Sequence, residues 1–294
     1  MRWKKVTLVG VGLLGGSLGL ALKQRRLAGS VVGFVRRIVS VRQCEKFGAV
    51  DSAMRDLANA VQGAELVVLC TPIGQMRSLV EQMLPALEPG TIVTDVGSVK
   101  ASVVRDLEPL VAKAGAFFVG SHPMAGAEKT GVSAARPDLF LDAVCVITPT
   151  AKSNRSAVGK IEQLWQSVGS RVLKLTPAVH DELVSRSSHL PHVVAAGLSN
   201  LVLGSDRPKE QRMLCANGFR DTTRIASGSP EMWRDIALAN RQNLVRSLGT
   251  FMQDLEAFSS ALKSGDEQAI SRFFEQAKQR RDKWSVKASS RSPE

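Results

Sequence analysis

Three glycines near the start of the chain have the spacing of a turn that binds a pyrophosphate. Gly10, Gly12 and Gly15 follow an apolar run and precede a helix-compatible stretch over residues 17–24, after which a second apolar run covers 30–34. A strand, a glycine turn, a helix and a strand form the context in which G-x-G-x-x-G binds a dinucleotide. The first glycine permits the turn, the second lets the backbone approach the pyrophosphate, and the third lets helix and strand pack closely. The phosphates would lie at the helix N-terminus, where free N–H groups and the dipole favour anions.

The end of the second apolar run indicates which dinucleotide would bind. A carboxylate often stands about 20 residues after such a turn and binds the adenosine ribose hydroxyls. Here that place holds Val35, followed by Arg36 and Arg37, and nine Lys and Arg precede Glu45, the first acidic residue. A carboxylate would repel a 2′-phosphate, whereas a guanidinium can clamp it in a bidentate way. The sequence therefore predicts a preference for NADP, with NAD possible.

Three further segments fall beyond the expected carboxyl ends of strands, where ligands bind in open α/β sheets. They are Thr71-Pro72, residues 95–98, which end at Ser98, and Ser121-His122. A histidine there can take a hydroxyl proton while hydride leaves the same carbon, and its ordinary pKa of about 6.5 suits that work. His122 is the only histidine in the first 179 residues. The alternative is a loop histidine whose hydrogen bonds are satisfied by the backbone.

The second half of the chain supplies two more histidines and an arginine. His189 and His192 are three residues apart and could bind a metal, but only two other histidines and no acidic cluster accompany them. We therefore expect no metal site. Arg224, in an Asp-Thr-Thr-Arg segment, could hold a substrate carboxylate or pair with Asp221.

The elements that must position these residues change in kind near Pro177. Before it, apolar strand-like runs alternate with helical stretches, which predicts a parallel sheet. After it the β signal vanishes, and Pro191 and Ser229-Pro230 are helix-start signals. An apolar stripe with helical spacing follows from Leu244 through Leu248, Phe251, Leu255, Phe258 and Leu262. The stripe packs either on its own domain or against a second subunit. We expect an α/β protein with a Rossmann-type dinucleotide-binding domain over 1–177 and an all-α domain over 178–294.

Composition and charge argue against several classes of protein. The net charge is +12, with 22 basic and 13 acidic residues before Pro177 and 17 and 14 from there on. The excess of positive charge therefore lies mainly in the expected cofactor domain, which suits phosphorylated and carboxylated small molecules. No nucleic-acid-binding motif is present, and no apolar segment approaches the roughly 20 residues that span a bilayer. The four cysteines are isolated, as in a reducing compartment. We expect a cytoplasmic protein that binds neither nucleic acid nor membranes.

A set of motifs, taken in order, resembles the prephenate and arogenate dehydrogenase family of tyrosine biosynthesis. The motifs are GVGLLGGSLGLAL, DVGSVK, SHPMAGAEKTG, SHLPH, GFRDTTRIA and MWRDI, and the resemblance runs from about Val6 to Trp284. It implies an oxidative decarboxylation. Hydride passes from the ring carbon bearing the 4-hydroxyl to the nicotinamide, the ring carboxylate leaves as CO2, and the ring becomes aromatic. The product would be 4-hydroxyphenylpyruvate from prephenate or tyrosine from arogenate.

The resemblance also implies roles for individual residues and a homodimer formed by the helical half. His122 would accept the 4-hydroxyl proton, and Ser98 would help to orient it and the substrate. Arg224 would bind a substrate carboxylate, and His192 would contact the side-chain end. The other implied substrate-binding residues are Glu128, Trp233 and Asp221. The expected cofactor-binding residues, most of them predicted above from the glycine turn and the strand ends, are Gly10, Gly12, Leu13, Leu14, Gly15, Arg36, Arg37, Thr71 and Pro72. Ala127 stands where other members often place a hydroxyl residue.

Two other readings of the residues stay open. A different hydroxyacid or imine oxidoreductase of the same architecture shares the glycine turn but does not explain the later motifs together. A nucleotide-sensing or nucleic-acid-binding protein with a catalytically idle fold would explain the basic balance. The choice between prephenate and arogenate is also open, because they differ only in a keto or amino group on the side chain.

Overall fold

The computed structural model describes residues 2–127 and 129–289. Contacts divide the chain into two compact units, residues 1–241 and 242–294. Among the described residues, no helix is long and apolar enough to span a membrane.

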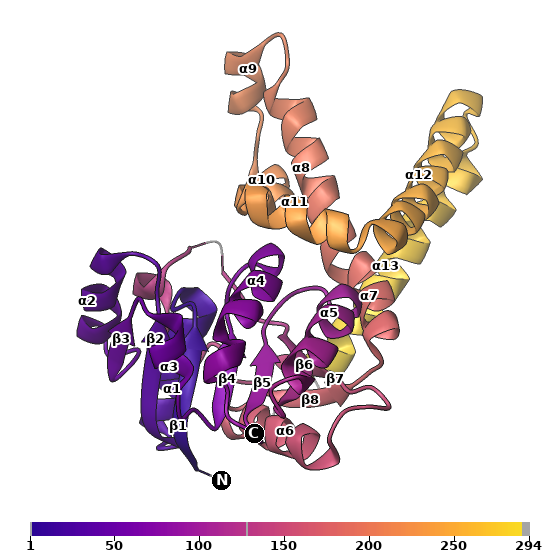
Figure 1. Cartoon of the computed structure of the whole chain (residues 1–294). Helices are drawn as coiled ribbons and strands as arrows, with labels where there is room; N and C mark the ends of the chain where they lie inside the picture. The colour runs from indigo at the N-terminus through magenta and orange to yellow at the C-terminus, as the bar shows by residue number, and fades with distance from the viewer. Residues whose placement is uncertain (1, 128, 290–294) are drawn as a thin grey trace. The chain divides into compact units, whose positions relative to one another are not determined.

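The first unit is built on one eight-stranded sheet (Figure 1) in the order β3-β2-β1-β4-β5-β6-β7-β8. The strands are β1 (Trp3–Val9), β2 (Ala28–Phe34), β3 (Ser52–Met54), β4 (Leu66–Leu69), β5 (Ile92–Asp95), β6 (Phe117–Pro123), β7 (Val144–Thr148) and β8 (Arg171–Lys174). Neighbouring strands are parallel except β6 and β7, which are antiparallel. The predicted parallel sheet is therefore confirmed except at this pair. The chain leaves β6 and enters β7 without the α-helical crossover that usually joins parallel neighbours.

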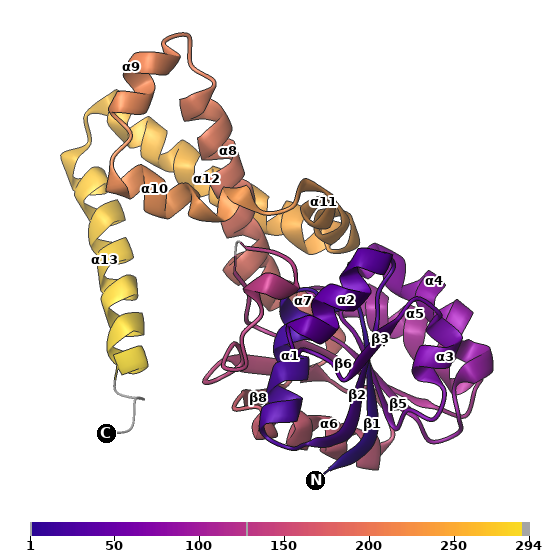
Figure 2. The ribbon, with the colours of Figure 1, turned by 90° about the vertical axis from the view of Figure 1, so that its left-hand side faces the viewer.

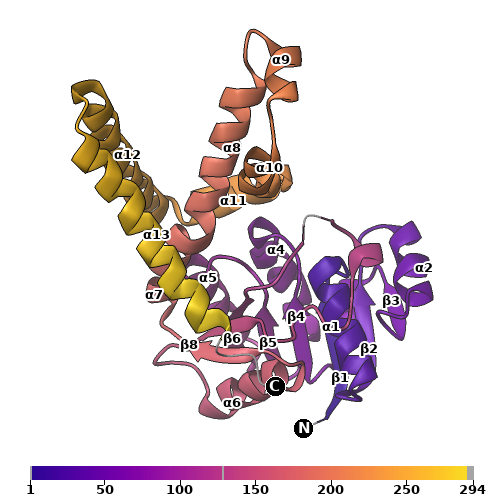
Figure 3. The ribbon, with the colours of Figure 1, turned by 180° about the vertical axis from the view of Figure 1, so that it is seen from behind.

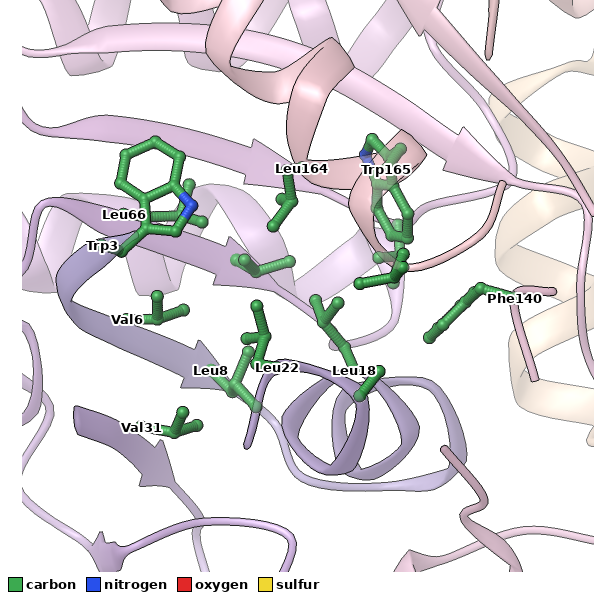
Figure 4. Packing of buried hydrophobic residues seen from close by; sticks show 14 of the residues in the cluster. Trp3, Val6, Leu8, Leu18, Leu22, Val31, Leu66, Phe140, Leu164 and Trp165 are labelled. Carbon is green, nitrogen blue, oxygen red and sulfur yellow. The ribbon is translucent and has the colours of Figure 1, made fainter. Parts of the chain in front are cut away.

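Helices bury both faces of the sheet. They are α1 (Leu13–Gln24), α2 (Ile38–Lys46), α3 (Leu57–Val61), α4 (Ile73–Met83), α5 (Ala101–Ala112) and α6 (Arg155–Ser167). Along β4, Leu66 and Val68 belong to one apolar cluster and Val67 to the other, as the alternation of side chains in a strand requires. Helices α1 and α6 contribute to the first cluster and α3, α4 and α5 to the second (Figure 2). Figure 4 shows the first cluster, which includes Phe140 and Trp165. Their rings pack edge to face, with centroids 5.3 Å apart.

Helices alone make up the rest of the first unit. They are α7 (Pro177–Val184), a π-helical segment (Ser185–His189), α8 (Leu190–Leu203), α9 (Pro208–Met213), α10 (Asn217–Thr223), a 3₁₀ turn (Arg224–Ser227) and α11 (Pro230–Ala239). Helix α11 starts at the expected signal, because the Ser229 hydroxyl accepts the N–H of Met232. Helix α8 begins beside Pro191 as expected, but it continues the π-helical segment, in which the Leu190 N–H bonds to the Ser185 carbonyl five residues back.

The second unit consists of most of α12 (Arg241–Ser264) and of α13 (Glu267–Ser289), which lie side by side (Figure 3). Phe258 of the predicted stripe lies 4.6 Å from Phe273 and 5.6 Å from Phe274, between ring centroids. Leu255 and Leu262 of the same stripe are 44% and 55% exposed. The stripe therefore packs partly within its own unit and leaves part of its apolar surface uncovered.

Candidate functional site

The glycine turn after β1 has the geometry expected of a phosphate-binding turn. Gly10 has a φ of +98°, and a side chain at Gly15 would place its Cβ 2.1 Å from the Gly10 carbonyl oxygen. A Cβ at Gly12 would meet nothing within 4 Å, and α1 begins there with no side chain capping its N-terminus. Gly10 and Gly15 are thus required by the fold itself, whereas Gly12 leaves open space over a helix N-terminus that favours anions.

Thr71 and Pro72 follow β4 beside this turn. The Thr71 methyl would lie 3.0 Å from a Cβ at Gly10, and its buried hydroxyl has no hydrogen-bond partner among the described residues. Buried polar atoms are nearly always satisfied, so a hydroxyl without a partner indicates that something else binds there. The residues around the turn therefore fit a dinucleotide.

Arg36 and Arg37 follow β2 and are exposed. Arg37 is the residue that precedes α2, and within the described parts of the chain neither guanidinium forms an ion pair. Nε of Arg55 donates to the Arg36 carbonyl at 3.1 Å, which brings a third guanidinium to this corner. Arg55 was missed from the sequence because it follows β3, a strand of only three residues.

His122 lies inside β6 and begins a chain of hydrogen bonds. Its Nδ1 lies 2.9 Å from Nε2 of His180, and Nδ1 of His180 lies 2.7 Å from Oδ1 of Asp181. The same carboxylate accepts the N–H of Lys100 at 2.7 Å and that of Ala101 at 2.9 Å, at the start of α5. His122, His180 and Asp181 are all buried. Asp181 therefore caps a helix of the sheet half and anchors the two histidines.

The anchored end of this chain determines where its protons lie. A backbone N–H can only donate, so the Asp181 carboxylate accepts and Nδ1 of His180 carries a proton. Nε2 of His180 is then the acceptor for Nδ1–H of His122, and Nε2 of His122 keeps its lone pair. Burial lowers the pKa of His122 well below its usual value, and His180, Lys100 and His189 act in the same direction. A neutral imidazole with a free lone pair on Nε2 is suited to accept a proton.

A buried ion pair fixes the strand ends around His122. The Lys100 ammonium pairs with Asp95 and donates to the Ser121 carbonyl at 3.0 Å, and neither side chain of the pair is exposed. Asp95 also accepts the N–H of Gly97 at 2.8 Å and that of Ser121 at 3.1 Å. These contacts join the turn after β5, which carries Ser98, to the strand that carries His122.

His189 occupies the end of the π-helical segment and is 1% exposed. Its Nδ1 lies 3.1 Å from Nδ2 of Asn240, and the same amide nitrogen lies 2.8 Å from the Asp181 carbonyl. Burial lowers the pKa of His189 to about 4, although Asp181 and the backbone of Ser98 act in the opposite direction. Its Nε2 has no hydrogen-bond partner among the described residues.

His192 follows one turn later and packs on Trp233. The two rings stack with centroids 3.7 Å apart, and Trp233 also meets His189 edge to face at 6.1 Å. Nδ1 of His192 lies 2.9 Å from the Ser188 carbonyl, which makes that nitrogen the proton donor. Burial lowers the pKa of His192 below its usual value. The ring therefore presents Nε2 as an acceptor beside an aromatic surface.

Comparison with known proteins decides the family. Two family models match, the nucleotide-binding domain of prephenate dehydrogenase over residues 18–174 and its dimerization domain over residues 176–276. The chain belongs to the prephenate dehydrogenase family. It is 34% identical over 280 residues to prephenate dehydrogenase of Bacillus subtilis, a match that covers 94% of this chain and 75% of that one.

Two solved structures of this family have the same fold. A crystal structure of prephenate dehydrogenase from Aquifex aeolicus, in complex with hydroxyphenyl propionate and NAD+, matches with a TM-score of 0.88 and 29% identity, covering 96% of this chain and 99% of that one. A crystal structure of Synechocystis arogenate dehydrogenase matches with a TM-score of 0.80 and 32% identity, and the match covers 95% of this chain and 99% of that one. The resemblance read from the motifs and the expected fold class, a Rossmann-type sheet followed by helices, are both confirmed.

The remaining predicted residues of this family member lie on several elements. Leu13 and Leu14 open α1 and are partly buried. Asp221 is in α10, and Arg224 begins the 3₁₀ turn that packs, with α10, against α8. Both are exposed, and Glu128 lies outside the described residues.

Besides Arg55, the sequence did not predict the residues that hold the histidines of the site, which are His180, Asp181 and Asn240. The adjacent His-Asp pair at the start of the helical half is the only sequence signal that could have indicated them. No group of three or more His, Cys, Asp or Glu suited to a metal occurs in the described part of the chain.

Proposed function

We propose that this chain oxidatively decarboxylates prephenate, arogenate or both, with hydride transfer to a nicotinamide dinucleotide. The observation that carries the proposal is the His122–His180–Asp181 chain, which leaves a neutral Nε2 lone pair on His122 at the carboxyl edge of the sheet. Two relatives named for these substrates match nearly the whole chain, which supports the same substrate class here.

The glycine turn and the strand ends would hold the cofactor. Gly10, Gly12 and Gly15 and the N–H groups that open α1 at Leu13 and Leu14 would receive the pyrophosphate, and Thr71 and Pro72 would line the nicotinamide side. A bound dinucleotide would supply the hydride acceptor. We further propose a preference for NADP over NAD, because Arg36, Arg37 and Arg55 gather where a ribose-binding carboxylate would stand.

His122 would carry the proton of the reaction. Nε2 takes the proton of the 4-hydroxyl while hydride leaves the carbon that bears it, and the carbon–oxygen bond becomes a carbonyl. The bond to the ring carboxylate then breaks and CO2 leaves. The electron pair of this bond enters the ring, which becomes aromatic as the carbonyl oxygen becomes a phenolate, and the phenolate takes back the proton held on His122. The Nδ1–H bond to His180 stabilises the positive charge that His122 gains, because His180 is in turn held by the Asp181 carboxylate.

The helical half would bind the substrate. We propose Arg224 for a carboxylate of the dianionic substrate, with Asp221 beside it, and His192 and Trp233 for the side-chain end. Ser98 would help to orient His122 and the substrate, and Glu128 completes the predicted set.

A homodimer is the expected form of the protein, with the cofactor domain over 1–177 and the substrate domain over 178–294. The name of the matched dimerization domain supports association, and so do the uncovered apolar residues of α12. The cytoplasmic location remains a prediction.

The test is a kcat/KM matrix of prephenate and arogenate against NAD and NADP. No turnover of either substrate with either cofactor would refute the proposal. In the active combination, His122→Asn should lower kcat by about 10²–10⁴, the usual contribution of a general base. Cofactor affinity, measured by fluorescence of the reduced dinucleotide, should stay unchanged in this variant. A near-normal kcat would remove His122 from the role of base.

A further inference from the structure

His189 is a buried side chain, and only one of its two ring nitrogens has a hydrogen-bond partner among the described residues. The ring is 1% exposed, and Nε2 has no hydrogen-bond partner among the described residues. The backbone of Ser98 lies beside the ring, but it does not meet hydrogen-bond geometry with Nε2. Because a polar N–H that is buried without a partner destabilises the fold, a native site retains one where a ligand supplies the acceptor.

Asn240 determines which nitrogen of His189 carries the proton. Its Nδ2 lies 2.8 Å from the Asp181 carbonyl, which can only accept, so this atom is the amide nitrogen and not the oxygen. The same NH2 group lies 3.1 Å from Nδ1 of His189, which must then accept. A neutral imidazole that accepts at Nδ1 carries its proton on Nε2. The free nitrogen is therefore a donor, and the ring is neutral at physiological pH because burial lowers its pKa to about 4.

Asp181 thus sets opposite proton positions on two histidines. Its carboxylate acts through His180 and leaves a lone pair on Nε2 of His122, and its carbonyl acts through Asn240 and leaves a proton on Nε2 of His189. Each ring is tied to Asp181 through one intervening side chain, His180 for His122 and Asn240 for His189.

From this arrangement we infer that His189 donates its Nε2–H to an oxygen of a bound ligand, and that Asn240 is the positioning residue that keeps this proton in place. The inference rests on the function proposed above. That function offers two sources of such an oxygen, the carboxamide of the nicotinamide and the oxygens of the cyclohexadienol substrate. In either case an uncharged donor suits the site, because it binds the oxygen without adding a positive charge beside a base that must accept a proton.

Two variants of His189 separate the hydrogen bond from the packing of the ring. His189→Phe keeps a planar ring against Trp233 and removes the N–H, whereas His189→Gln keeps an N–H donor near the place of Nε2. The loss of one such bond should weaken the ligand about tenfold in His189→Phe and much less in His189→Gln. Asn240→Asp tests the positioning role, because a carboxylate accepts Nδ1–H and turns Nε2 into an acceptor. This variant should behave like His189→Phe.

The assay has one arm for each source of the oxygen. Fluorescence titration gives the Kd of the reduced dinucleotide, and steady-state turnover at saturating cofactor gives KM for the substrate. A rise in the Kd of the dinucleotide would mean that His189 donates to the carboxamide of the nicotinamide. A rise in the substrate KM at constant Kd would mean that it donates to the substrate. Either result supports the inference. The inference would be overturned if both Kd and KM of folded His189→Phe stayed within twofold of those of the unmodified protein. It would also be overturned if His189→Phe and His189→Gln lost the same affinity for the ligand. Absence of turnover in the unmodified protein would instead refute the proposed function, and the Kd arm would still test His189.

Discussion

Removal of the buried Lys100 ammonium is the perturbation whose size the structure defines best. In Lys100→Met, a side chain of similar length leaves Asp95 without its cation and the Ser121 carbonyl without a donor. Breaking a buried pair from one side costs about 3–5 kcal/mol. Asp95 keeps the N–H groups of Gly97 and Ser121, so we expect the lower end of that range, about 3 kcal/mol. The backbone N–H of Lys100, which bonds to Asp181, is unaffected.

The matched control is the double variant Asp95→Asn/Lys100→Met, which removes the buried charge as well. Asparagine can still accept one of the two N–H groups, so the double variant should be more stable than Lys100→Met alone. Urea unfolding followed by tryptophan fluorescence, at fixed protein concentration because association adds stability, gives the free energy of unfolding for each variant. A loss of less than about 1 kcal/mol in Lys100→Met, the size of a surface ion pair, would refute this expectation. A double variant less stable than Lys100→Met would also refute it.

Three other predictions concern the cofactor turn, the 2′-phosphate and pH. Gly15→Ala should destabilise the fold, because its Cβ would lie 2.1 Å from a backbone oxygen. Gly12→Ala should fold normally and lose cofactor affinity, because its Cβ would meet nothing within 4 Å. Thermal melts measure the stability of both variants and dinucleotide titrations measure their affinity, and identical behaviour of the two would contradict this prediction. Arg36→Ala should raise KM for NADP by about 10- to 100-fold, as expected for the loss of a charge-assisted bond, and should change KM for NAD little; equal effects would overturn the assignment. Because the unfolded chain binds a proton at His189 that the folded chain binds only near pH 4, the contribution of His189 to the free energy of unfolding should fall by about 3 kcal/mol between pH 6.5 and pH 4. His189→Phe should reduce that slope in urea titrations, and an unchanged slope would contradict the cause.

Much of the fold is visible in the sequence because its signals are local. The glycine turn lies between two apolar runs, and each residue of the turn meets a demand set by its near neighbours, such as the positive φ of Gly10. Strands buried on both faces, such as β4, are continuous apolar runs and are found for that reason. Shorter or more polar elements, such as α2, β3 and α3, were missed because they lack such a run. The direction of β7 is set by how the chain returns after β6, which no local pattern records.

The sequence by itself determined that a histidine stands at a strand end beside a dinucleotide turn, and its motifs indicated the family. Only the tertiary structure decided the protonation of that histidine. The partner that controls it, His180, comes from 58 residues away, and the carboxylate that orients His180 belongs to the adjacent Asp181. A proton position depends on which donor or acceptor lies within about 3 Å of each ring nitrogen. Residue types along a chain do not fix such distances. They are fixed by the packing of α7, which carries His180 and Asp181, against α5 and β7.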